Sequence, residues 1–92
     1  MLNINEKGNF KQLYDFITEN KKNIYTMIFL DNKKISAAFD TCYESDNGFD
    51  FDDSKYEEFI SIVMKNTEND ELFEFNYHNM PIEVYSGKEK IL

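Results

Sequence analysis

Apolar residues repeat at helical spacing in two stretches of the chain. Phe10, Leu13, Tyr14 and Ile17 follow the i, i+3, i+4, i+7 pattern, which predicts a helix from Asn9 to about residues 20–22. The same pattern recurs at positions 56, 59, 60, 63 and 64. Ser54 and Glu57 have the spacing of a capping box, so a second helix is predicted from there to Asn66.

Four other segments have the composition or the alternation of β-strands. Residues 24–31 and 34–44 predict a first hairpin, with Asn32 and Lys33 as its loop. In that register Leu30 faces Ile35 and Ile28 faces Ala37, which puts the apolar residues of both strands on one side. Residues 72–78 alternate, with Phe73, Phe75 and Tyr77 on one face, and a turn at Asn79 and Met80 would pair them with residues 82–86 in a second hairpin. Pro81 lacks a backbone N–H and is expected to open an edge strand.

The predicted order is therefore helix, strand, strand, helix, strand, strand, which is an α+β fold of type αββαββ. Two hairpins can join into a four-stranded antiparallel sheet, with both helices over its more apolar face. A chain of 92 residues has room for one modest core, so residues 1–92 are expected to form a single domain.

The reverse side of the first predicted hairpin is also apolar, because it carries Tyr25, Met27 and Phe29. Either the sheet is covered on both faces, or this patch is an interface with a second copy of the chain. We favour the interface, and self-association as a homodimer is therefore one expectation.

Charge is unevenly distributed along the sequence. The formal net charge is −8, and residues 35–85 hold thirteen acids and two lysines, which gives −11 for that segment. Such a field repels nucleic acid and anionic membranes and favours a basic protein partner. All ten basic residues are lysines, and the absence of arginine further argues against direct binding to nucleic acid.

The densest acidic run surrounds residues 46–58. It does not match the calcium loop of an EF-hand in either frame, because Gly48 falls at position 3 of one and Lys55 at position 6 of the other. A solvated loop explains part of the acid, but the functional interpretation is an array of carboxylates that takes the place of nucleic-acid phosphates in a basic groove. Phe49 and Phe51 are either aromatic anchors of that contact or core residues beneath the loop. The predicted partner-binding residues are Asp46, Phe49, Asp50, Phe51, Asp52, Asp53, Glu57 and Glu58.

Catalytic and metal chemistry have weak support in the sequence. Cys42 and His78 could pair as nucleophile and base, but no orienting third group and no oxyanion-hole signature accompany them. One cysteine and one histidine do not make a zinc site. We therefore predict a non-enzymatic protein without catalytic residues, metal or cofactor. The longest apolar run is Met27–Leu30 and no signal peptide is evident, so we expect a location in the bacterial cytoplasm.

In size, acidity and α+β composition the chain resembles the small phage-encoded inhibitors of host defence, of the anti-CRISPR and anti-restriction type. The resemblance implies a non-enzymatic inhibitor that occupies the nucleic-acid site of a basic partner. Two alternatives remain. One is a homo-oligomeric structural or regulatory protein, and the other is an immunity protein or antitoxin that neutralises a cationic toxin.

Overall fold

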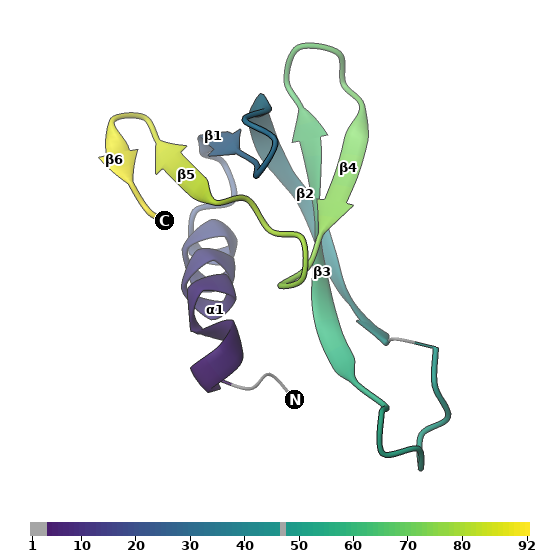
Figure 1. The fold of residues 1–92 in the computed structure, drawn as a ribbon. Coiled ribbons are helices and arrows are strands. Elements are labelled where there is room, and N and C mark those ends of the chain that lie inside the picture. The colour runs from purple at the N-terminus through teal and green to yellow at the C-terminus, as the bar shows by residue number, and fades with distance from the viewer. Residues whose placement is uncertain (1–3, 47) are drawn as a thin grey trace.

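A computed structural model describes the backbone of residues 4–46 and 48–92, and side chains from residue 8 onward except that of residue 47 (Figure 1). Within these ranges the chain forms one helix, α1 (Ile4–Glu19), and an antiparallel sheet of six strands. The strands are β1 (Ile24–Ile28), β2 (Lys34–Asp46), β3 (Glu58–Asn66), β4 (Leu72–Phe75), β5 (Glu83–Ser86) and β6 (Glu89–Lys90). Their order across the sheet is β4-β3-β2-β1-β5-β6.

The αββαββ prediction is wrong, chiefly because the second predicted helix is a strand. Residues 56 and 57 belong to a loop, and residues 58–66 form β3, which pairs with β2 from Asp46↔Glu58 to Ala37↔Asn66. The apolar positions from 59 to 64 are interrupted only by Ser61, so they fit a helical and an extended period equally well. The β-branched Ile60, Ile62 and Val63 favour the extended form, and pairing along β2 fixes it.

The first hairpin exists, but its predicted register is wrong. Met27 pairs with Ile35 and Tyr25 pairs with Ala37, whereas the predicted register places Ile28 opposite Ala37. The turn is longer than two residues: the Phe29 N–H donates to the Lys33 carbonyl at 2.9 Å, and Asn32 adopts a left-handed φ of 65°. An odd shift of register turns the other face of a strand inward. Tyr25 and Met27 are therefore fully buried, while Ile24 is 50% exposed.

The second predicted hairpin does not form. β4 pairs with β3 at one edge of the sheet, and β5 pairs with β1, on the other side of β2. Residues 76–82, called the crossover here, join them across the curved sheet (Figure 1), and the Ile82 N–H donates to the Ile28 carbonyl at 2.8 Å. Pro81 is buried in this crossover and does not open an edge strand.

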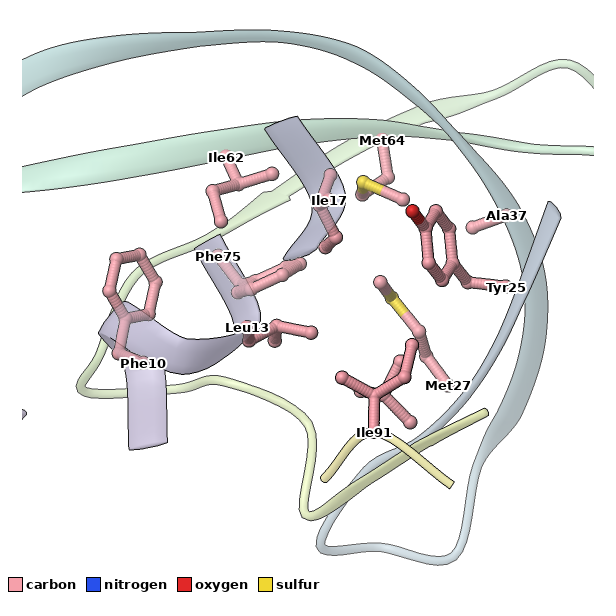
Figure 2. Close-up of a cluster of buried hydrophobic side chains, with 11 residues drawn as sticks. Phe10, Leu13, Ile17, Tyr25, Met27, Ala37, Ile62, Met64, Phe75 and Ile91 are labelled. Atoms are coloured by element: carbon pink, nitrogen blue, oxygen red, sulfur yellow. The ribbon is translucent and has the colours of Figure 1, made fainter. Parts of the chain in front are cut away.

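The core lies between α1 and the concave face of the sheet (Figure 2). The inward face predicted for the first helix is confirmed, because Phe10, Leu13 and Ile17 are almost fully buried, although the helix begins earlier than Asn9. The sheet and the C-terminal segment supply the remaining buried apolar residues: Tyr25, Met27, Ala37, Ile62, Met64, Phe75, Val84 and Ile91. Ring contacts of Phe29 with Phe73 at 6.2 Å and with Phe75 at 6.5 Å show that curvature brings the turn after β1 close to β4.

β2 extends well beyond the strand that covers its first half. β1 pairs only with residues 34–38 of β2, and the register shifts at Asp40, between Phe39 and Thr41. Beyond this bulge β2 and the first half of β3 continue as a two-stranded arm, whose loop lies away from α1 (Figure 1). We call residues 40–58, which run from the bulge in β2 to the first residue of β3, the acidic arm. Residues 46–58 are its tip.

Candidate protein-binding site

The acidic arm carries nearly all of the net charge of the protein. Residues 40–58 contain eight acids and one lysine, which gives −7 out of a total of −8. Apart from Glu57, every acid of the arm is exposed to solvent. The fold therefore separates the charge into one projecting element, and the potential around that element is strongly negative.

Short turns define the backbone of the tip. The Gly48 N–H donates to Asp46 Oδ1 at 2.8 Å, and the Lys55 N–H donates to Asp53 Oδ1 at 2.8 Å. Between them the Asp53 N–H donates to the Asp50 carbonyl at 2.9 Å. Gly48 has a φ of 86°, a value that side-chain-bearing residues rarely adopt. Local hydrogen bonds thus hold the side chains of Asp46 and Asp53 and shape the backbone between them.

The two phenylalanines of the tip lie at the surface and not in the core. Phe49 is 45% exposed and Phe51 is 82% exposed. The Phe51 ring packs on Tyr56 with centroids 5.4 Å apart, and the Lys55 ammonium lies 6.0 Å from the Phe49 ring centroid. The sequence left open whether these side chains are aromatic anchors at the surface or core residues beneath the loop. The structure places both at the surface, among the acids of the tip.

Like charges face each other where the arm meets its tip. Asp46 and Glu58 are direct cross-strand partners, an arrangement that destabilises a sheet. Tyr56 lies beside them, and its pKa is raised above the ordinary 10.0, first by partial burial and then by the negative charges of Glu58 and Asp46. A nearby anion raises the pKa of a phenol because it disfavours the phenolate. The free protein therefore retains unfavourable charge at this position.

Replacing Asp46 by asparagine should relieve this repulsion while keeping the Oδ1 acceptor for the Gly48 N–H. The free energy of unfolding is expected to rise by about 0.3 kcal/mol, and the pKa of Tyr56 to fall towards 10.0. Urea denaturation and NMR titration of the tyrosine ring measure the two effects. Asp50→Asn removes the same charge without a facing acid, and an equal gain in that control would contradict the explanation.

Glu57 differs from the other predicted binding acids because its carboxylate points to the crossover. It accepts a hydrogen bond from the Tyr77 hydroxyl, and its Oε1 lies 3.0 Å from His78 Nε2. The Tyr77 and His78 ring centroids lie 3.9 Å apart with the planes tilted by 35°, and Phe59 makes T-shaped contacts with both rings. This cluster joins the tip of the arm to the crossover.

Two of the three residues predicted for self-association lie in the interior, and the third is partly buried. Tyr25 and Met27 are fully buried under α1, and Phe29 packs against the same core. The Tyr25 hydroxyl also donates to the Asn20 carbonyl at 2.9 Å, so its polar atom is satisfied within the chain. Tyr25 and Met27 are therefore not available at the surface, whereas Phe29 is partly exposed.

Cys42 and His78 contact different neighbours. The Cys42 thiol lies beside Tyr14 of α1, whose pKa is raised by burial and then by that thiol, while His78 contacts Glu57. Among the described residues, no three histidine, cysteine or acidic side chains are grouped so that they could hold a metal ion.

One surface feature was missed by the sequence analysis. An open groove of about 770 Å³ lies between the turn that joins β1 to β2 and the crossover. Its apolar lining consists of Phe29, Leu30, Ile35, Phe73, Met80 and Ile82, and Asp31, Lys33, His78 and Asn79 are its polar residues. The groove depends on a crossover that brings β4 and β5 to opposite sides of the sheet, and no local pattern predicts that connection.

The class of protein follows from a comparison with protein families, which places the chain among immunity proteins. Residues 8–85, more than half of the chain, match the family described as cognate immunity protein YxxD. The chain therefore belongs to that family, and its partner is a protein, the cognate toxin. Of the functions considered from the sequence, this match supports the immunity protein and lends no support to an anti-CRISPR or anti-restriction inhibitor.

Searches of the curated proteins and of the solved structures found no match. In the part of the chain that the structure describes, no helix is long and apolar enough to cross a bilayer.

Proposed function

We propose that this protein neutralises its cognate toxin by binding a basic surface of that toxin with the acidic arm. The observation that carries the proposal is the concentration of −7 charge on one projecting element of the fold. Complementary charge accelerates encounter and selects the partner. The encounter takes place in the bacterial cytoplasm, before the toxin reaches its target.

The toxin surface that fits this arm is one built to hold phosphates. Exposed carboxylates spaced along the tip can take the positions of backbone phosphates, and release of counterions from the basic groove adds a salt-dependent driving force. Phe49 and Phe51 stand among these carboxylates and supply apolar contact area at the centre of the interface. Occupation of the groove would exclude nucleic acid, so binding alone is sufficient for inhibition.

The cross-strand pairing of Asp46 with Glu58, two acids of the arm, agrees with this proposal. A like-charged pair that weakens the free protein is relieved when a lysine or arginine of a partner is placed against it. Relief of this repulsion adds to the free energy of binding. Glu57 contributes differently, since its carboxylate is held by Tyr77 and His78 and fixes the tip to the body.

Co-expression with the toxin tests the function. Cells that produce the cognate toxin should survive only when this chain is produced as well, and the purified pair should separate when nucleic acid is added in excess. Survival without a stable complex would contradict the proposal, and so would a complex that nucleic acid leaves intact.

A further inference from the structure

The tip of the arm is too small to form a stable interface alone. The tip comprises thirteen residues and the whole arm nineteen, whereas each partner in a standard complex contributes roughly 20–30 residues and buries about 800 Å². Charge contacts at an exposed tip are also screened beyond about 8 Å at physiological ionic strength. An interface that persists in the cell therefore needs additional contact area, and apolar burial is the form of contact that salt does not weaken.

Glu57 of the tip contacts the crossover at the apolar groove. His78 lines the groove and also holds Glu57, so one residue belongs to both surfaces. Tyr77, the next residue, hydrogen-bonds the same carboxylate. A partner seated on the tip consequently meets the crossover, and the crossover is one wall of the groove.

The exposed residues of the groove have the character of a binding surface. Leu30 is 84% exposed at the turn between β1 and β2, and Ile82 is 47% exposed on the opposite wall. Phe29, Phe73 and Met80 form a partly buried floor packed against the core. Apolar side chains that line a concave site, with few polar groups around them, are suited to receive a single apolar anchor.

We propose that the apolar groove is a second contact site for the same toxin, which inserts an aliphatic or aromatic side chain that it presents beside its basic surface. The inference rests on the proposed function and assigns a different role to each of the two surfaces. The acidic arm governs the association rate and its salt dependence, and the groove governs how long the complex lasts.

Leu30→Ser and Ile82→Ser test the groove, with Leu72→Ser as the matched control. Leu72 is 58% exposed on β4 and does not line the groove. The ligand is the toxin that the chain neutralises in co-expression, and the readouts are its association and dissociation rates at low and high ionic strength. Each groove variant should raise the dissociation rate about tenfold without changing the salt dependence, and the control should behave as wild type. The urea midpoints of all variants should stay close to that of wild type, with the largest decrease for Ile82→Ser, whose side chain is about half buried.

The outcomes separate this inference from the proposed function. The groove has no role in binding if its variants dissociate as slowly as wild type while replacement of Asp50, Asp52 and Asp53 by lysine abolishes binding. That result would leave the proposed role of the arm intact. If the groove variants dissociate faster while the arm variant binds normally, the groove stands and the proposed role of the arm fails. The proposed role of the groove would also be contradicted if the groove variants and the arm variant both kept wild-type kinetics. The same holds if Leu72→Ser raised the dissociation rate as much as the groove variants do.

Discussion

Replacing Asp50, Asp52 and Asp53 by lysine is expected to weaken toxin binding by at least about a hundredfold, or about 2.7 kcal/mol. The three side chains are exposed on the tip, so each reversal removes an attraction and adds a repulsion without disturbing the core, and Asp53→Lys also removes the Oδ1 acceptor of the Lys55 N–H. The net charge changes by two for each residue, from −8 to −2. Most of the loss should appear in the association rate at low ionic strength, where the field of the arm reaches furthest.

The same change of net charge at other positions provides the control. Glu19, Glu68 and Glu89 are exposed and lie outside the arm, and replacing all three by lysine also leaves −2. Calorimetry or surface-based kinetics with the toxin compares the two variants. If they lose affinity equally, then the total charge matters and its position does not, which would contradict a binding site on the arm.

Met27→Ala is expected to lower the free energy of unfolding by about 2–5 kcal/mol. Met27 is fully buried between α1 and the sheet, so its removal leaves a cavity and forfeits apolar burial. A domain of this size has a total stability of roughly 5–15 kcal/mol, so a substantial part would be lost. Urea denaturation followed by circular dichroism measures the difference.

Ile24→Ala is the control for this prediction, because Ile24 lies on the same strand but is 50% exposed on the other face. It should cost less than about 1 kcal/mol. The register that the sequence favoured reverses the order of the two effects, since it places Ile24 inward and Met27 outward. A larger cost for Ile24→Ala would therefore contradict the observed pairing of β1 with β2.

Local pattern predicted the elements whose signal lies within a few residues. The face of α1 that carries Phe10, Leu13 and Ile17 and the hairpin of β1 and β2 were both found, because periodicity and turn residues report them directly. The acidic run was found for the same reason, since charge is read position by position. That the run is an exposed arm, with Phe49 and Phe51 at the surface, could be seen only in the fold.

Long-range pairing decided what local pattern left open. Residues 59–64 suit a helix or a strand, and the nine-pair register with β2 makes them a strand. A turn longer by a few residues reversed the inward face at Tyr25 and Met27. The crossover depends on the curvature of the whole sheet, so neither the separation of β4 from β5 nor the apolar groove could be inferred from residues 72–86 alone.

Hydrogen–deuterium exchange of the chain, free and bound to its toxin, tests the central claim most directly. The amides of Gly48, Asp53, Lys55 and Tyr56 donate hydrogen bonds within the tip of the free protein, and a bound partner should slow the exchange of the tip further. We expect protection across residues 48–58 on binding, together with residues 76–82 of the crossover. Protection confined to other parts of the sheet or to α1, with unchanged exchange in the tip, would contradict binding through the acidic arm.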